Sequence, residues 1–145
     1  MVTRSGAPGD AGSSRHAGAK KTVYFSARLP ARTKSTLEKF ARENRLSSSA
    51  AATQLLEEGL RMNRFPGIDF RWTPSGRQAH VTGTGLTAWE MHMIWTDHGR
   101  RVEKVLKNFP HLSAVQILAA ARYIEAYPDE IPSTEPPPWA RAVRV

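Results

Sequence analysis

The chain contains no cysteine and no long apolar run. Without thiols, disulfides and thiolate zinc sites are excluded, which fits a protein of a reducing compartment. No apolar stretch approaches the roughly 20 residues that span a bilayer, and the N-terminal residues lack the apolar core of a signal peptide. We therefore expect a cytoplasmic protein with no membrane contact.

Patterns that would indicate catalysis are also lacking. Gly83-Thr84-Gly85 precedes a predicted helix, but it lacks the lysine and the glycine spacing of a phosphate-binding loop and is better explained as a turn. The 145 residues leave little room for a large catalytic cleft. We expect a binding protein without metal or cofactor, not an enzyme. The five histidines show no metal-ligand spacing: they are His16, His80, His92, His98 and His111.

Positive charge is what the chain has in excess, with 21 Lys and Arg against 13 Asp and Glu and a net charge of +8. Residues 1–22 carry +3, residues 23–65 carry +4, residues 66–131 are neutral and the remainder carries +1. Such a surplus suits a polyanionic partner such as nucleic acid, although solubility alone is an alternative explanation. We therefore place DNA binding in the N-terminal half.

Both ends of the chain have the composition of segments without a core. Residues 1–20 are rich in Gly, Ala and Ser, which predicts a disordered basic arm that either touches the DNA backbone or has no role. Residues 132–145 form a Pro-rich tail that we expect to be flexible. In this tail Trp139 and Val143 are candidate partner-binding residues, with a single exposed aromatic of no function as the alternative.

Residues 21–63 have the pattern of a strand followed by two helices. Polar and apolar residues alternate from Thr22 to Leu29, which predicts a half-buried strand. Pro30 ends this strand, an amphipathic helix runs to about Asn44, and the serines at 47–49 begin a second helix. One strand cannot satisfy its own backbone, so we expect an obligate homodimer in which two copies form an antiparallel ribbon with four helices around a shared core.

Residues 66–131 are predicted to form a second small domain after a linker at 62–67. Two apolar segments around a Thr-Pro-Ser-Gly turn indicate a hairpin. Three helices follow: one that begins at about Thr87, one at 101–109 and one at about 114–127. Two capping boxes mark helix starts: Thr87 with Glu90 and Ser113 with Gln116. The predicted fold class is thus mainly α with short β.

The segment from Tyr24 to Pro30 resembles the ribbon of Arc-type and MetJ-type ribbon-helix-helix repressors, and the similarity extends through Glu43-Asn44 into the second helix. The resemblance implies that Tyr24, Ser26 and Arg28 read base edges in the major groove of double-stranded DNA. A two-stranded ribbon fits that groove, and Arg donates bidentately to guanine. An ordinary solvated strand surface is the alternative, and the Tyr24 ring has the further alternative of packing at the ribbon edge.

In the same family the start of the second helix holds a DNA phosphate, which implies that role for Ser47, Ser48 and Ser49; plain helix capping is the compatible alternative. Arg45 departs from the pattern, since these repressors often have Gly there, and a left-handed residue at that point costs a non-Gly residue roughly 1 kcal/mol. Four further cations are candidate phosphate contacts or merely solvated charges: Lys20, Lys21, Arg32 and Lys34.

Residues 66–131 resemble a family of small bacterial domains of unknown function that often act as antitoxins beside PIN-like toxins. The similarity rests on Gly83-Thr84-Gly85, Ala88-Trp89-Glu90, residues 109–113 and the helix ending near Tyr127-Pro128, with Gly85 where the family usually has Arg. It implies a winged-helix-like domain. Because this segment is neutral, we expect it to serve oligomerisation or partner binding and not DNA binding.

The sequence therefore predicts a sequence-specific transcriptional repressor, a homodimer that stacks into higher multimers on operator repeats. A toxin-antitoxin role adds a protein toxin as partner and makes the repression autoregulatory. The alternative is a DNA-organising or plasmid-partition protein that coats DNA cooperatively.

Overall fold

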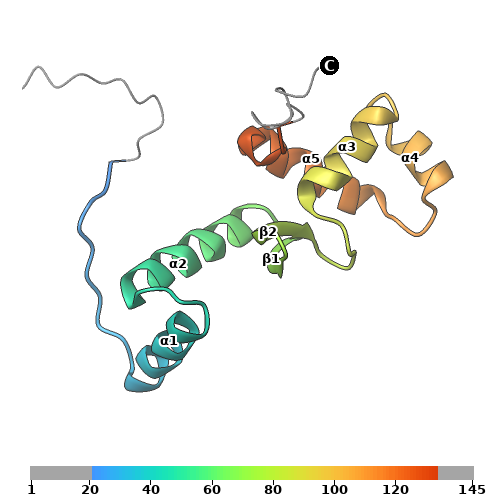
Figure 1. The fold of residues 1–145 in the computed structure, drawn as a ribbon. Helices are drawn as coiled ribbons and strands as arrows, with labels where there is room; N and C mark the ends of the chain where they lie inside the picture. The colour runs from blue at the N-terminus through green and yellow to red at the C-terminus, as the bar shows by residue number, and fades with distance from the viewer. Residues whose placement is uncertain (1–20, 134–145) are drawn as a thin grey trace, which may run out of the picture.

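A computed structural model describes residues 21–133 of the chain. The described residues form five α-helices, one short 3-10 helix and a two-stranded antiparallel sheet, so the predicted mainly helical class with short β is confirmed. The predictions for residues 1–20, with Lys20, and for Trp139 and Val143 concern residues outside the described range. The elements are α1 (Ala31–Glu43), α2 (Ser48–Arg64), β1 (Ile68–Thr73), β2 (Gly76–Val81), α3 (Ala88–Asp97), α4 (Val102–Asn108), α5 (Ala114–Ala126) and η1 (Pro128–Glu130) (Figure 1).

The connection between α1 and α2 is a tight turn made by a left-handed residue. Arg45 has a φ of 55°, and its amide donates to the Arg42 carbonyl at 3.2 Å. The next amide, that of Leu46, donates to the Ala41 carbonyl at 2.8 Å, so the pair of bonds forms a Schellman motif. The left-handed residue that the resemblance suggested at position 45 is therefore present. It is an arginine, whose Cβ makes this conformation more costly than it is for glycine.

We expect Arg45→Gly to stabilise the fold by up to about 1 kcal/mol, because glycine adopts positive φ without the steric cost that an arginine bears. The measurement is the urea midpoint at a fixed protein concentration. A matched Arg42→Gly variant, inside α1, should lose about the same amount. Destabilisation by both glycines would show that the turn is not strained.

Helix α2 continues past the start of the predicted linker. It ends at Arg64, and the break comes only with Pro66, since proline disfavours helical geometry in the residue before it. Phe65 packs edge-on against Tyr123 with ring centroids 5.5 Å apart, and β1 begins at Ile68. The short connection therefore contributes to the packing, and the two halves are not separated by a free linker.

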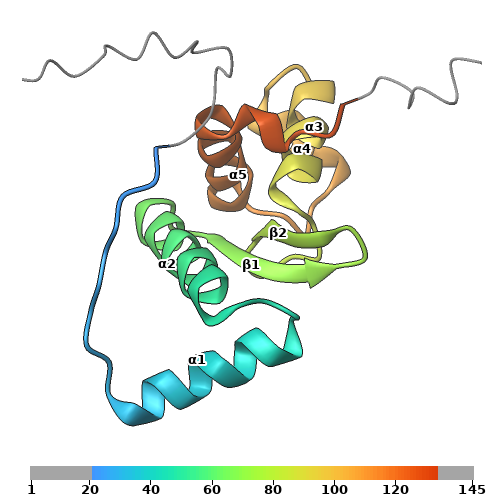
Figure 2. The same cartoon turned by 60° about the vertical axis from the view of Figure 1, so that its left-hand side comes forward.

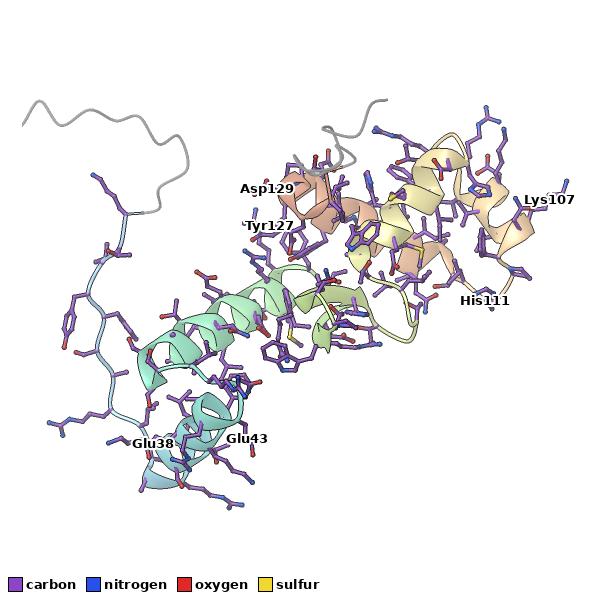
Figure 3. All side chains as sticks on the ribbon, viewed as in Figure 1. Glu38, Glu43, Lys107, His111, Tyr127 and Asp129 are labelled. Atoms are coloured by element: carbon purple, nitrogen blue, oxygen red, sulfur yellow. The ribbon has the colours of Figure 1, made fainter. Side chains whose placement is uncertain are left out.

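Two polar contacts fasten α2 to the second half. Arg77 of β2 donates from Nε to both oxygens of the buried Glu58, at 2.6 and 3.0 Å. Arg61 donates to the Tyr123 hydroxyl at 3.0 Å, and its guanidinium lies 4.0 Å from the centroid of the Tyr127 ring. Figure 3 shows Tyr127 at this junction, beside the C-terminal part of α2.

The hairpin and the two capping boxes agree with prediction. β1 pairs with β2 antiparallel, with Ile68 opposite Val81 and Thr73 opposite Gly76. Both boxes are complete, with Thr87 and Glu90 exchanging bonds at the start of α3 and their counterparts doing so at α5. Each box satisfies two amides that a helix leaves free, which is why these helix starts were legible in the sequence.

The hydrophobic core lies entirely in the second half. Its buried cluster is formed by the hairpin, α3, α4 and α5, and includes Met91, Ile117 and Tyr123. Residues 21–64 contribute only three buried residues, Ala41, Ala51 and Glu58. The first half therefore has no core of its own within one copy of the chain.

Across residues 21–133, helices are too short or too polar to cross a bilayer.

Candidate nucleic-acid interface

Residues 21–30 are extended and solvent-exposed, and they pair with no strand of the described chain (Figures 1 and 2). The strand predicted at 22–29 is thus absent from the single copy. Its apolar residues are left in water, with Val23 86% and Phe25 76% exposed. The physical reason is that a strand needs backbone partners, and the hairpin of the second half is already paired with itself.

An apolar groove of about 720 Å³ runs between this stretch and the two helices of the first half. From the extended stretch it is lined by every second residue, Phe25, Ala27 and Leu29. The alternation in the sequence therefore corresponds to one face turned toward α1 and α2. The helices contribute Thr33, Thr36, Leu37 and Phe40 from α1 and Ala52, Leu55 and Leu56 from α2.

The opposite face of the stretch carries the three residues predicted to read bases. Tyr24, Ser26 and Arg28 are exposed, Tyr24 by 91%, and none of them lines the groove. Along the chain these three residues alternate with the three that line the groove.

The start of α2 shows the predicted cap. Ser47 Oγ accepts from the amide of Ala50 at 3.0 Å, and all three serines are exposed. The amides of Ser48 and Ser49 belong to the first turn, where a helix has no internal acceptors to offer. Capping by Ser47 is therefore confirmed, while two amides remain at an open, electropositive helix end.

The cations predicted to contact phosphate differ in their surroundings. Lys21 is exposed, Lys34 lies 3.8 Å from Glu38 on α1, and Arg32 lines the apolar groove. Arg45 was not among the predicted phosphate contacts, yet it is exposed in the turn two residues before Ser47. The sequence pointed to it only because an arginine stands where these repressors often have glycine.

The second half, residues 66–131, carries no net charge, unlike the first half. Its residues Lys107 and His111 lie at the end of the molecule remote from α1 (Figure 3). At the junction of the hairpin with α3, Arg71 of β1 donates to the Thr84 carbonyl at 2.8 Å and forms two bonds with Asp69. Burial alone opposes ionisation of Asp69, but the bonds from Arg71 and Thr82 outweigh it and hold the pKa of that carboxyl below its usual range.

Among residues 21–133, no three His, Cys, Asp or Glu side chains come together in a group that could hold a metal ion. The chain matches no curated protein and no solved structure. One part of it does match a family, and this part falls inside the predicted domain at 66–131, for which the sequence indicated a family of unknown function. Residues 75–124, from the hairpin turn to α5, match the family described as "Protein of unknown function (DUF433)".

Proposed function

We propose that this chain is a sequence-specific DNA-binding transcriptional repressor that acts as a ribbon-helix-helix homodimer. The observation that supports it best is the apolar groove, which joins the alternate residues of the extended stretch to the exposed apolar faces of α1 and α2. A groove of this kind is one half of a core, and a second copy supplies the other half.

The energetics favour such a dimer. Full burial of a Phe or Leu side chain contributes about 1.5 to 3 kcal/mol. In one copy Phe25 is 76% exposed, Leu29 48% and Leu56 55%. Pairing of the two stretches also gives their backbones the ladder partners that they lack. Association therefore contributes to offsetting the cost of ordering residues 21–30.

In the dimer the two polar faces lie side by side and present six side chains to the DNA. A two-stranded ribbon enters the major groove, where Arg28 donates to guanine, Ser26 bonds to either kind of base pair and Tyr24 contacts base edges. The amides of Ser48 and Ser49, with Arg45 beside them, hold a phosphate on each side.

We propose that the neutral second half, a hairpin followed by three helices in a winged-helix-like arrangement, serves contacts with protein and not with DNA. DNA affinity rests largely on phosphate neutralisation, and residues 66–131 have no net charge to supply it. In the antitoxin form of the proposal its partner is a toxin. A small nuclease-like reading frame beside the gene supports that form, and its absence favours a free-standing regulator.

Arg28→Ala is expected to weaken binding to the specific site by about 1 to 3 kcal/mol and to relax base preference, because it removes donors to a base edge. Lys21→Ala should weaken specific and random DNA alike, since a phosphate contact carries no sequence information. Fluorescence anisotropy on both DNAs measures the two effects. Equal loss on both DNAs for Arg28→Ala would contradict base reading.

Footprinting of the purified full chain on the DNA upstream of its own gene, at physiological salt, tests the proposed function. We expect a short protected site, or a few phased ones if dimers stack. Uniform protection over a long stretch would support the DNA-organising alternative, and no protection would contradict an autoregulatory repressor.

A further inference from the structure

Helix α5 carries a second apolar face besides the one that packs into the core. Ile117, Ala120 and Ile124 are buried in the core cluster. On the opposite side of the helix, Val115 is 76% exposed and Leu118 39%. A surface helix normally keeps polar residues on the face opposite its buried stripe. These two side chains therefore form an apolar surface that residues 21–133 leave uncovered.

A hollow of about 240 Å³ adjoins this surface, between α5 and the connection that follows α2. Phe65 and Pro66 of the connection line it, together with Val115, Leu118 and Ala119 of α5. A cavity of about 150 Å³ accommodates benzene, so this hollow has room for one large apolar side chain.

The walls of the hollow are held in place by packing. The Phe65 ring lies edge-on to those of Tyr123 and Tyr127, with ring centroids 5.5 and 5.8 Å apart. A Cβ added at Gly67 would lie 3.2 Å from the Cβ of Ala119, so the connection and α5 are in close contact. The hollow is therefore formed before a partner arrives, and binding there does not bear the cost of ordering its walls.

Two exposed arginines line the same hollow, Arg64 at the end of α2 and Arg122 on α5. Within residues 21–133, neither guanidinium forms an ion pair, whereas Arg61, Arg71 and Arg77 are all paired. The described lining of the hollow contains no Asp or Glu. The surface therefore combines exposed apolar side chains with two cations whose charge is not balanced locally.

Charge decides which occupant fits this surface. A second copy that used the same face would bring Arg64 and Arg122 toward their own counterparts, and like charges in a contact repel. Residues 134–145 of the chain carry two arginines and one glutamate, so they are no better matched. DNA binding rests on phosphate neutralisation by several cations, and α5 has one. A protein segment with carboxylates beside an apolar side chain matches both the charge and the hollow.

We propose that this face of α5 is the docking surface for an acidic segment of another protein. An apolar side chain of the segment fills the hollow against Leu118, and its carboxylates pair with Arg64 and Arg122. The inference rests on the proposed role of the second half in protein contacts, and it gives that role a surface and a partner chemistry. The surface is separate from the apolar groove of the first half, because the two share no lining residue.

A library of random short peptides displayed on phage is the probe. It is selected on the immobilised full-length protein, and the enriched peptides are synthesised with a fluorophore and titrated by anisotropy. We expect enriched sequences in which Asp or Glu stands close to a large apolar residue. Because the whole chain is basic, acidic peptides alone would not locate the site, so the binding is then compared in variants.

Three variants at exposed positions locate the binding. Leu118→Glu removes apolar surface and adds a carboxylate, and Arg122→Glu reverses one of the two charges, so each should weaken the peptides by roughly tenfold or more. Lys107→Glu makes the same charge change on α4, outside the hollow, and should bind as the wild type does. An unchanged thermal midpoint verifies the fold of each variant, and Arg122→Glu carries the test if Leu118→Glu is unstable.

Peptides that bind Leu118→Glu and Arg122→Glu as tightly as the wild type would overturn the proposal, and so would enriched peptides without acidic residues. Either result counts against this surface and its partner chemistry alone. Failure to enrich any peptide would contradict the role in protein contacts as well, while the footprint tests the DNA-binding role separately. Loss of DNA affinity in Arg122→Glu but not in Lys107→Glu would assign this face to DNA and also overturn the proposal.

Discussion

Leu56→Glu is expected to give a monomer that no longer binds DNA. Leu56 lies on α2, lines the apolar groove and is 55% exposed in one copy. In the proposed dimer, the substitution therefore places a carboxylate on the surface that the second copy covers. Each copy loses about 1.5 to 3 kcal/mol of apolar burial, and desolvating the charge costs several kcal/mol more. Two-fold symmetry doubles the effect. Sedimentation velocity measures the mass, and anisotropy the DNA binding.

The matched control is Leu118→Glu on α5. Leu118 is also exposed, and it belongs to the second half, outside the groove. This variant should retain the mass and the DNA affinity of the wild type. A Leu56→Glu protein that still sediments as a dimer would contradict the assignment of the groove to a second copy.

Arg77→Ala is expected to lower the free energy of unfolding by about 3 kcal/mol. The substitution leaves Glu58 buried without its cation, and removal of one partner of a buried ion pair is far more costly than the pair is worth. Part of Arg77 is exposed to solvent, which places the effect at the lower end of the range for such pairs. Urea denaturation at fixed protein concentration measures it.

The double variant Glu58→Leu with Arg77→Met separates charge from packing. Replacement of both partners by apolar residues removes the uncompensated carboxylate, so this protein should recover most of the stability lost in Arg77→Ala. A double variant as unstable as Arg77→Ala would show that the loss comes from packing, for example of Arg77 on the Trp72 ring.

The features that could be predicted from the sequence are those set by neighbouring residues. The boxes at Thr87 and Ser113 need only a residue three positions later. The lining of the groove by Phe25, Ala27 and Leu29 needs only a period of two. Local spacing decides each of these.

The contacts that fix α2 to the second half could not be predicted in this way. Glu58 and Arg77 form their hydrogen bonds across 19 residues of sequence, and Arg61 and Tyr123 across 62 residues. The pattern of charges along the chain does not show which side chains come into contact when the helices and strands pack together. For the same reason the sequence placed a linker where α2 continues to Arg64.

The predicted strand differs from both cases. The sequence shows the alternation, and Phe25, Ala27 and Leu29 do line the groove, yet residues 21–30 form no ladder in a single copy. In the proposed dimer, the second chain supplies the backbone partners that are missing here. The sequence indicates such a partner only because a single strand cannot satisfy its own backbone hydrogen bonds.

The central claim is that two copies pair along residues 22–29, and the absence of natural cysteine allows a direct test. One cysteine is placed in turn at positions 24 to 28 and the protein is oxidised mildly. Residues nearest the two-fold axis of an antiparallel ribbon face their own counterparts at about 4.5 to 5.5 Å between Cα atoms, within disulfide range. We predict efficient cross-linked dimer at one or two adjacent positions. Cross-linking no better than that of Val115→Cys, on exposed α5, would contradict the ribbon.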